Sequence, residues 1–235
     1  MFDAKHFVYI LEDEYYQRAK VGGLKAASIT VAANQDFHSA YRYVRDFVRR
    51  VNQQNNRFRL AIRVADIEKA YDEGKIALMM DFQDSQPLES DAGFVEVFYT
   101  LGVRCIQLAY FLGNVVGCGS GERWDYGLTY FGLDVLSELN RLNMLIDVSH
   151  CGHLTTMDAI QYSKSPVAMT HANSRTVCNH HRNKTDEELK ALAEKGGVVG
   201  VETMPTHVSN KRDPTVEDLL NHIDYMTDLM GVDHV

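Results

Sequence analysis

The chain has 235 residues, of which 45% are hydrophobic, and its formal net charge is −8. This length is enough to bury the core of one large α/β domain, and the acidic balance argues against a nucleic-acid partner. No run approaches the roughly 20 apolar residues of a membrane span, and the first residues do not follow the pattern of a signal peptide. We therefore expect a cytoplasmic protein without a membrane partner, which acts on small molecules or peptides. Its four cysteines lack C-x-x-C spacing, so we expect free thiols.

Apolar, β-branched runs alternate with helical patterns along the chain. The strands predicted in this way cover residues near 2–9, then 24–32, 76–82, 103–110, 144–150, 166–171 and 197–201. The helices predicted between and after them cover residues 37–51, 94–101, 131–142, 152–163, about 186–195 and about 216–230. Thr185 and Glu188 have the spacing of a capping box at the start of the helix near 186.

This alternation predicts parallel strands with helices outside, and seven strands followed by a strand-like start at residues 231–235 fit a TIM-like (β/α)8 barrel. We expect a single barrel domain over residues 1–235 that ends at the start of its eighth strand. Because the first and seventh strands would then lack a neighbour, we also expect the chain to be poorly soluble or to associate, with a homo-oligomer as one form of association.

Two of the predicted strands end in a histidine, at His150 and His171. One crossover helix fits between these strands, so they read as parallel neighbours whose last residues can point into the same space. Neutral imidazole nitrogen is a good zinc ligand, and the pair is therefore a candidate metal site. The alternative is that each is a core histidine bonded to a backbone carbonyl.

An irregular, glycine-rich segment at residues 111–129 follows the predicted strand 103–110, at the end of the strands where barrel enzymes build their sites. Asn114 in this segment is a candidate substrate-binding residue. Arg182 follows the second histidine strand and can bind a substrate carboxylate through two parallel hydrogen bonds, although an arginine in a polar loop is usually a surface residue. Its loop position suggests few packing partners.

Several motifs then follow one another in the order found in the membrane (renal) dipeptidase family, peptidase family M19, and the sequence resembles that family from about Gly22 onward. The motifs are LGVR at 101–104, DYGLTYFG at 125–132, ELNR at 138–141, IDVSH at 146–150, THANS at 170–174 and HRN at 181–183. The resemblance implies an amidohydrolase-like barrel that cleaves dipeptides at a zinc site. By position, His150 and His171 match two zinc-binding histidines, and Arg182 matches the arginine that binds the substrate carboxylate.

The sequence also departs from this family at positions that the resemblance implies are functional. Lys5 and Phe7 stand where the family has the H-x-D zinc ligands, and Gln83 stands where it has a bridging glutamate. Tyr110 replaces a histidine and is a catalytic candidate, because its hydroxyl can donate a hydrogen bond to an oxyanion. An aspartate of the eighth strand is expected just after Val235.

Two hypotheses follow from these matches and departures. The first is a zinc-dependent dipeptidase or related amide hydrolase, with one zinc ion rather than two because only two of the usual ligands are in view, and with Gln83 as a weak candidate at the bridging position. The second is a catalytically silent homologue that binds a peptide or another small molecule.

Overall fold

The structure is a computed structural model that describes residues 2–6 and 8–235, with side chains from Tyr9 onward. The chain divides into two compact units, Met1–Ile106 and Gln107–Val235, which are described one at a time. No helix among the described residues has the length and apolar character needed to cross a membrane.

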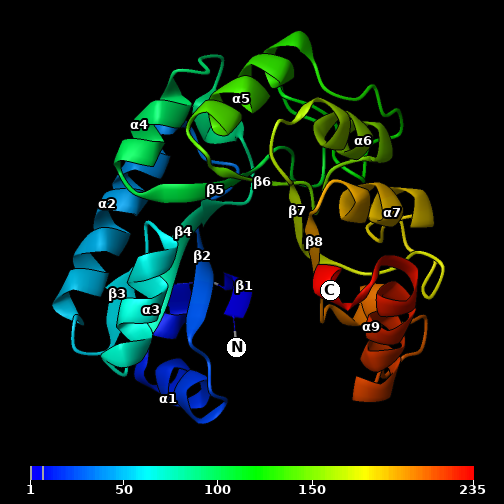
Figure 1. The fold of residues 1–235 in the computed structure, drawn as a ribbon. Coiled ribbons are helices and arrows are strands. Elements are labelled where there is room, and N and C mark those ends of the chain that lie inside the picture. Colours follow the sequence, from blue (N-terminus) through cyan, green and yellow to red (C-terminus); the bar gives the residue numbers. More distant parts are fainter. Residues whose placement is uncertain (1, 7) are drawn as a thin grey trace. The chain divides into compact units, whose positions relative to one another are not determined.

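The first unit is built on parallel strands in the order β1-β2-β4-β5 (Figure 1). Their bounds are Phe2–His6 for β1, Ala26–Ala32 for β2, Ile76–Phe82 for β4 and Val103–Gln107 for β5. A short strand, β3 (Phe58–Leu60), pairs with the first half of β4, and β5 pairs with its second half. Strand β4 therefore has a neighbour on both sides along its length, which agrees with its apolar sequence.

The helices of the first unit bury regular apolar stripes. They are α1 (Asp13–Val21), α2 (Phe37–Gln53), α3 (Val64–Asp72) and α4 (Phe94–Thr100), with 3₁₀ turns η1 (Val8–Leu11) and η2 (Gln86–Leu88). In α2, Ala40, Val44, Phe47 and Val51 are buried at the spacing of one helix face. The Asp36 carboxylate caps this helix by accepting a hydrogen bond from Ser39 N at 2.8 Å.

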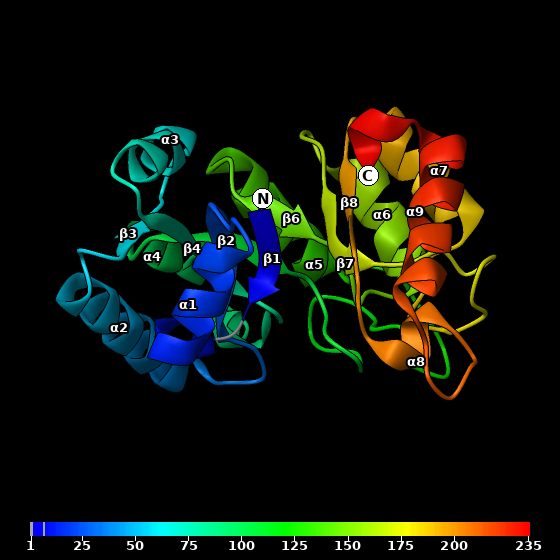
Figure 2. The ribbon, with the colours of Figure 1, turned by 90° about the horizontal axis from the view of Figure 1, so that it is seen from below.

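The second unit contains three parallel strands in the order β6-β7-β8 (Figures 1 and 2). They are β6 (Leu145–Asp147), β7 (Ala168–Ala172) and β8 (Val198–Val201). The helices are α5 (Tyr130–Arg141), α6 (His153–Tyr162), α7 (Asp186–Glu194), α8 (Pro205–Val208) and α9 (Val216–Met230). Helices α7 and α9 lie against β8. Because β6, β7 and β8 are parallel, the residues that follow their carboxyl ends lie at the same edge of the sheet.

The strands and helices predicted from the sequence are confirmed to within a few residues, and the capping box at Thr185 and Glu188 is present. All four cysteines are free, as expected. The prediction of a strand start at residues 231–235 is wrong. Val232–His234 forms a 3₁₀ turn, η3, closed by a 3.1 Å hydrogen bond from His234 N to Gly231 O. Strand β3 and helices α1, α3 and α8 were not predicted. Strand β3 has three residues and α8 has four, which is too short for a periodic pattern to show.

Candidate metal and active site

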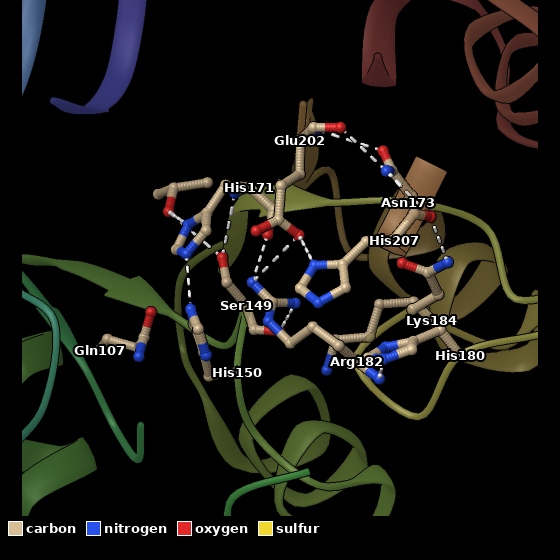
Figure 3. Close-up of polar contacts among 12 residues, drawn as sticks. Gln107, Ser149, His150, His171, Asn173, His180, Arg182, Lys184, Glu202 and His207 are labelled. Atoms are coloured by element: carbon tan, nitrogen blue, oxygen red, sulfur yellow. Dashed lines mark hydrogen bonds and ion pairs between the residues drawn. The ribbon is translucent and has the colours of Figure 1, made fainter. Parts of the chain in front are cut away.

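The two predicted histidines meet at the ends of adjacent strands. His150 follows β6, His171 lies in β7, and their Nε2 atoms approach to 2.8 Å (Figure 3). Each residue is 9% exposed, so the pair lies at the edge of the buried layer. The two rings thus present their Nε2 atoms to each other at hydrogen-bonding distance.

A buried carboxylate, Asp147, lies behind this pair at the end of β6. It accepts hydrogen bonds from Ser149 Oγ at 2.5 Å, Thr170 Oγ1 at 2.7 Å and Ser149 N at 3.0 Å. Thr170 Oγ1 in turn lies 2.9 Å from Nδ1 of His171. Asp147 therefore reaches the histidine ring through one hydroxyl group.

Arg182 lies beneath the histidines and is only 2% exposed. Its guanidinium donates to the backbone oxygen of Ser149, and to that of His171 at 2.6 Å (Figure 3). Its Nη2 atom lies 3.9 Å from Oε2 of Glu202. Burial lowers the pKa of Arg182, whereas the Glu202 carboxylate raises it. The expectation that Arg182 has few packing partners is wrong, because its loop folds back under both strand ends and the guanidinium joins them.

A second acid–imidazole pair, which was not predicted, follows the end of β8. Oε2 of Glu202 accepts from Nδ1 of His207 at 2.8 Å, and the His207 ring stacks on the His180 ring with centroids 4.4 Å apart. Burial, and then the neighbouring His207, lower the pKa values of His180 and His181. Because these groups come from β8, α8 and the loop before α7, only the fold brings them together.

A buried ion pair fastens the loops behind the histidines. Lys184 Nζ donates to the backbone oxygen of Cys151 at 2.9 Å and to Thr156 Oγ1 at 2.8 Å, and it lies 3.3 Å from Oε1 of Glu188. Burial alone raises the pKa of Glu188, but the Lys184 ammonium and two hydrogen bonds from Thr185 outweigh it, and the pKa falls to about 2.

The other predicted site residues have different surroundings. The Tyr110 ring packs on His150 with centroids 4.4 Å apart, which places this catalytic candidate beside the histidine pair. The Asn114 side chain donates to Leu108 O at 2.9 Å and accepts from Val116 N at 2.7 Å, so its amide holds its own loop together. A direct substrate contact by Asn114 stays a prediction.

The remaining candidates belong to the first unit. Gln83 is 8% exposed and directly follows β4, with its backbone N bonded to Ala32 O at 2.9 Å. The side chains of Lys5 and Phe7 lie outside the described residues.

The glycines of the irregular segment 111–129 serve close backbone packing. A Cβ atom at Gly119 would lie 2.4 Å from the backbone oxygen of Phe111. This contact within the loop explains why glycine is needed at position 119 without any ligand.

Two solved structures share this fold. An amidohydrolase from Pseudomonas aeruginosa is 33% identical, with a TM-score of 0.92 over 99% of this chain and 70% of that chain. A metallo peptidase from Rhodobacter sphaeroides, solved with a phosphinate mimic of the dipeptide L-Ala-D-Ala, has a TM-score of 0.90 at 20% identity, over 100% of this chain and 83% of that chain. The fold class is thus the TIM-like barrel of the amidohydrolase type, as predicted.

The profile of membrane dipeptidase, peptidase family M19, matches residues 12–235, and the chain belongs to this family. An uncharacterized protein in the pqqA 5′ region of Klebsiella pneumoniae is 31% identical over 189 residues, which are 76% of this chain and 70% of that protein. An uncharacterized dipeptidase of Schizosaccharomyces pombe is 29% identical over 215 residues, which are 86% of this chain and 52% of that protein. The chain therefore spans about half of the length of this dipeptidase relative.

Proposed function

We propose that this protein is a zinc-dependent hydrolase of dipeptides or related small amides, with one zinc ion held by His150 and His171. The observation that carries the proposal is the 2.8 Å approach of the two Nε2 atoms at neighbouring strand ends. Membership of the dipeptidase family favours a hydrolase over a catalytically silent binding module.

The histidine pair fits a zinc ion as two of its ligands. Two nitrogens bound to a tetrahedral zinc ion at about 2.0–2.1 Å lie roughly 3.3 Å apart, so the rings need to separate by only about 0.5 Å. Among the side chains that the structure describes, from Tyr9 onward, no group of three or more His, Cys, Asp or Glu is placed to hold a metal ion. We assign one ion to the two histidines, with its remaining positions left for water or substrate.

Bound zinc would supply Lewis-acid polarisation of the scissile carbonyl. Tyr110, which packs on His150, is the residue to which we assign a hydrogen bond to the developing oxyanion. Arg182 carries five N–H groups, and those that do not bond Ser149 and His171 are the ones we assign to the substrate carboxylate. Glu202 lies near the same guanidinium and would have to share it with the substrate.

The metal assignment is tested by zinc content after dialysis, measured on the wild type, on the double variant His150→Ala/His171→Ala, and on His38→Ala. His38 is an exposed histidine of α2, so the last variant removes an imidazole without touching the pair. We expect about one zinc ion in the wild type and in the control, and a large loss in the double variant. Equal zinc content in all three proteins would disprove the site.

The carboxylate assignment is tested by calorimetric titration of the zinc-loaded protein with the phosphinate mimic of L-Ala-D-Ala. We expect Arg182→Lys to weaken binding by about 1.5–3 kcal/mol, because a lysine cannot replace the planar, charge-assisted hydrogen bonds. A mimic whose terminal carboxylate is blocked as an amide serves as control and should bind both proteins with similar affinity. If the free-acid mimic also binds both proteins equally, Arg182 does not recognise the carboxylate.

A further inference from the structure

We propose that Asp147 and Thr170 are positioning residues that fix the tautomer of His171, so that its Nε2 atom carries a lone pair directed at the metal position. This inference rests on the metal site proposed above. It assigns a role to two residues that were not among the predicted site residues.

The direction of each hydrogen bond follows from counting protons. Asp147 accepts from two backbone N–H groups, those of Ser149 at 3.0 Å and Thr170 at 3.2 Å, as expected for a carboxylate. Thr170 Oγ1 has one proton and three neighbours that can accept it, Asp147 Oδ2 at 2.7 Å, His171 Nδ1 at 2.9 Å and Ser149 Oγ at 3.2 Å. The charged carboxylate is the strongest acceptor and the closest one, so the proton points to Asp147.

The threonine oxygen then has only lone pairs to offer to His171. Nδ1 of His171 must therefore carry the ring proton and donate it to Thr170 Oγ1. In a neutral imidazole this leaves Nε2 without a proton. That atom is the one that faces His150 Nε2 at 2.8 Å.

The same network also fixes the position of the His171 backbone. Ser149 Oγ gives its proton to Asp147 at 2.5 Å and accepts from His171 N at 3.1 Å. Asp147 thus holds both the backbone and the ring of His171, each through one hydroxyl group.

A local irregularity of β7 allows neighbouring side chains to cooperate in this way. Successive side chains of a regular strand point to opposite faces, which would separate Thr170 from His171. The pairing of β7 with β8 shifts register between Met169 and Ala172. Such a shift turns side chains away from strict alternation, and bulges of this kind are common beside active sites.

A fixed tautomer matters because a free imidazole distributes its proton between both nitrogens. When one ring nitrogen of a metal-binding histidine is held by a hydrogen bond, the other nitrogen is already unprotonated and oriented toward the metal. Loss of the residue that makes this hydrogen bond typically weakens metal binding about 10–100-fold. The same range is expected here when the Thr170 hydroxyl is removed.

The test uses three threonine variants of the full chain. Thr170→Val removes the hydroxyl but keeps the shape, and Thr170→Ser keeps the hydroxyl. Thr30→Val is the matched control. Thr30 Oγ1 donates to the buried Asp81 at 3.1 Å, beside Ser28 Oγ at 2.5 Å, which resembles the arrangement around Asp147. Among the side chains described from Tyr9 onward, no histidine bonds to Thr30 Oγ1.

Two quantities are measured on each protein. The first is the tautomer of His171 in the metal-free state, read from ¹⁵N–¹H correlations of the imidazole rings, with the His171 signals identified by their loss in His171→Gln. The second is the zinc dissociation constant, measured by competition with a chelator. We expect Nδ1-protonated His171 and wild-type affinity in Thr170→Ser and Thr30→Val, and we expect Thr170→Val to show a mixed tautomer and an affinity about 10–100-fold lower.

The two readouts separate this inference from the metal assignment. A locked tautomer that is lost in Thr170→Val supports the role of Thr170 even if no variant binds zinc, a result that would overturn only the proposed metal site. If the wild type binds zinc but its His171 ring is a tautomer mixture, or if Thr170→Val keeps both the tautomer and the affinity, the positioning role is refuted. An equal loss of affinity in Thr170→Val and Thr30→Val would assign the effect to general destabilisation and would also refute it.

Discussion

The buried pair of Lys184 and Glu188 makes a prediction about stability and pH. The pKa of Glu188 falls from an ordinary value of 4.5 to about 2 in the folded protein. A difference of about 2.5 units corresponds to about 3 kcal/mol of folding free energy, since each unit is worth about 1.4 kcal/mol. Because the folded pKa is depressed, this contribution is complete above the unfolded pKa and is lost as the pH falls from about 5 to 2.

The variant Glu188→Gln removes the titrating group. The free energy of unfolding is measured by urea denaturation at pH 6 and pH 3 for both proteins. The advantage of the wild type over the variant should shrink by about 2 kcal/mol between these pH values, because at pH 3 the carboxylate still retains part of its contribution.

The matched control is Glu187→Gln, which removes the same charge from the same first turn of α7 but from a side chain that is 69% exposed. It should change stability by no more than about 0.5 kcal/mol at either pH. If the difference in free energy of unfolding between the wild type and Glu188→Gln is the same at pH 6 and pH 3, the prediction is refuted. Glu188 would then not stabilise the fold as a buried, paired carboxylate.

Two further predictions concern packing around the site. Arg182→Ala should lower the free energy of unfolding, measured in urea, by about 2–6 kcal/mol. The reason is that two buried backbone oxygens lose their hydrogen-bond donor, at about 1–3 kcal/mol each. An unchanged free energy of unfolding would show that Arg182 does not stabilise the two strand ends. Gly119→Ala should lower the free energy of unfolding by about 1–3 kcal/mol, because the new Cβ would lie 2.4 Å from the backbone oxygen of Phe111. The control is Gly22→Ala, whose new Cβ would have its nearest contact at 3.3 Å and which should therefore lower stability less. Both variants are compared with the wild type by thermal melting. Equal melting temperatures of the two glycine variants would show that the loop yields easily.

The metal candidates could be found from the sequence because each is marked locally. His150 and His171 end two short apolar runs that are separated by the length of one helix. Parallel pairing of these two strands is enough to place the histidines side by side. Tyr110 could be found only through the family resemblance, and the structure places its ring on His150. Homo-oligomer formation and a single domain over residues 1–235 stay predictions.

The sequence by itself determined the alternation of strands and helices, the family, and the two histidines, because hydrophobic periodicity and short motifs are local properties. Only the tertiary structure decided that Arg182 and Lys184 are buried, since the backbone oxygens that they bind belong to Ser149, Cys151 and His171, more than ten residues away along the chain. It also decided that Glu202 pairs with His207 and that Asp147 reaches His171 through Thr170. Burial and hydrogen-bond direction depend on segments that meet only after folding, and no residue type or spacing records them in advance.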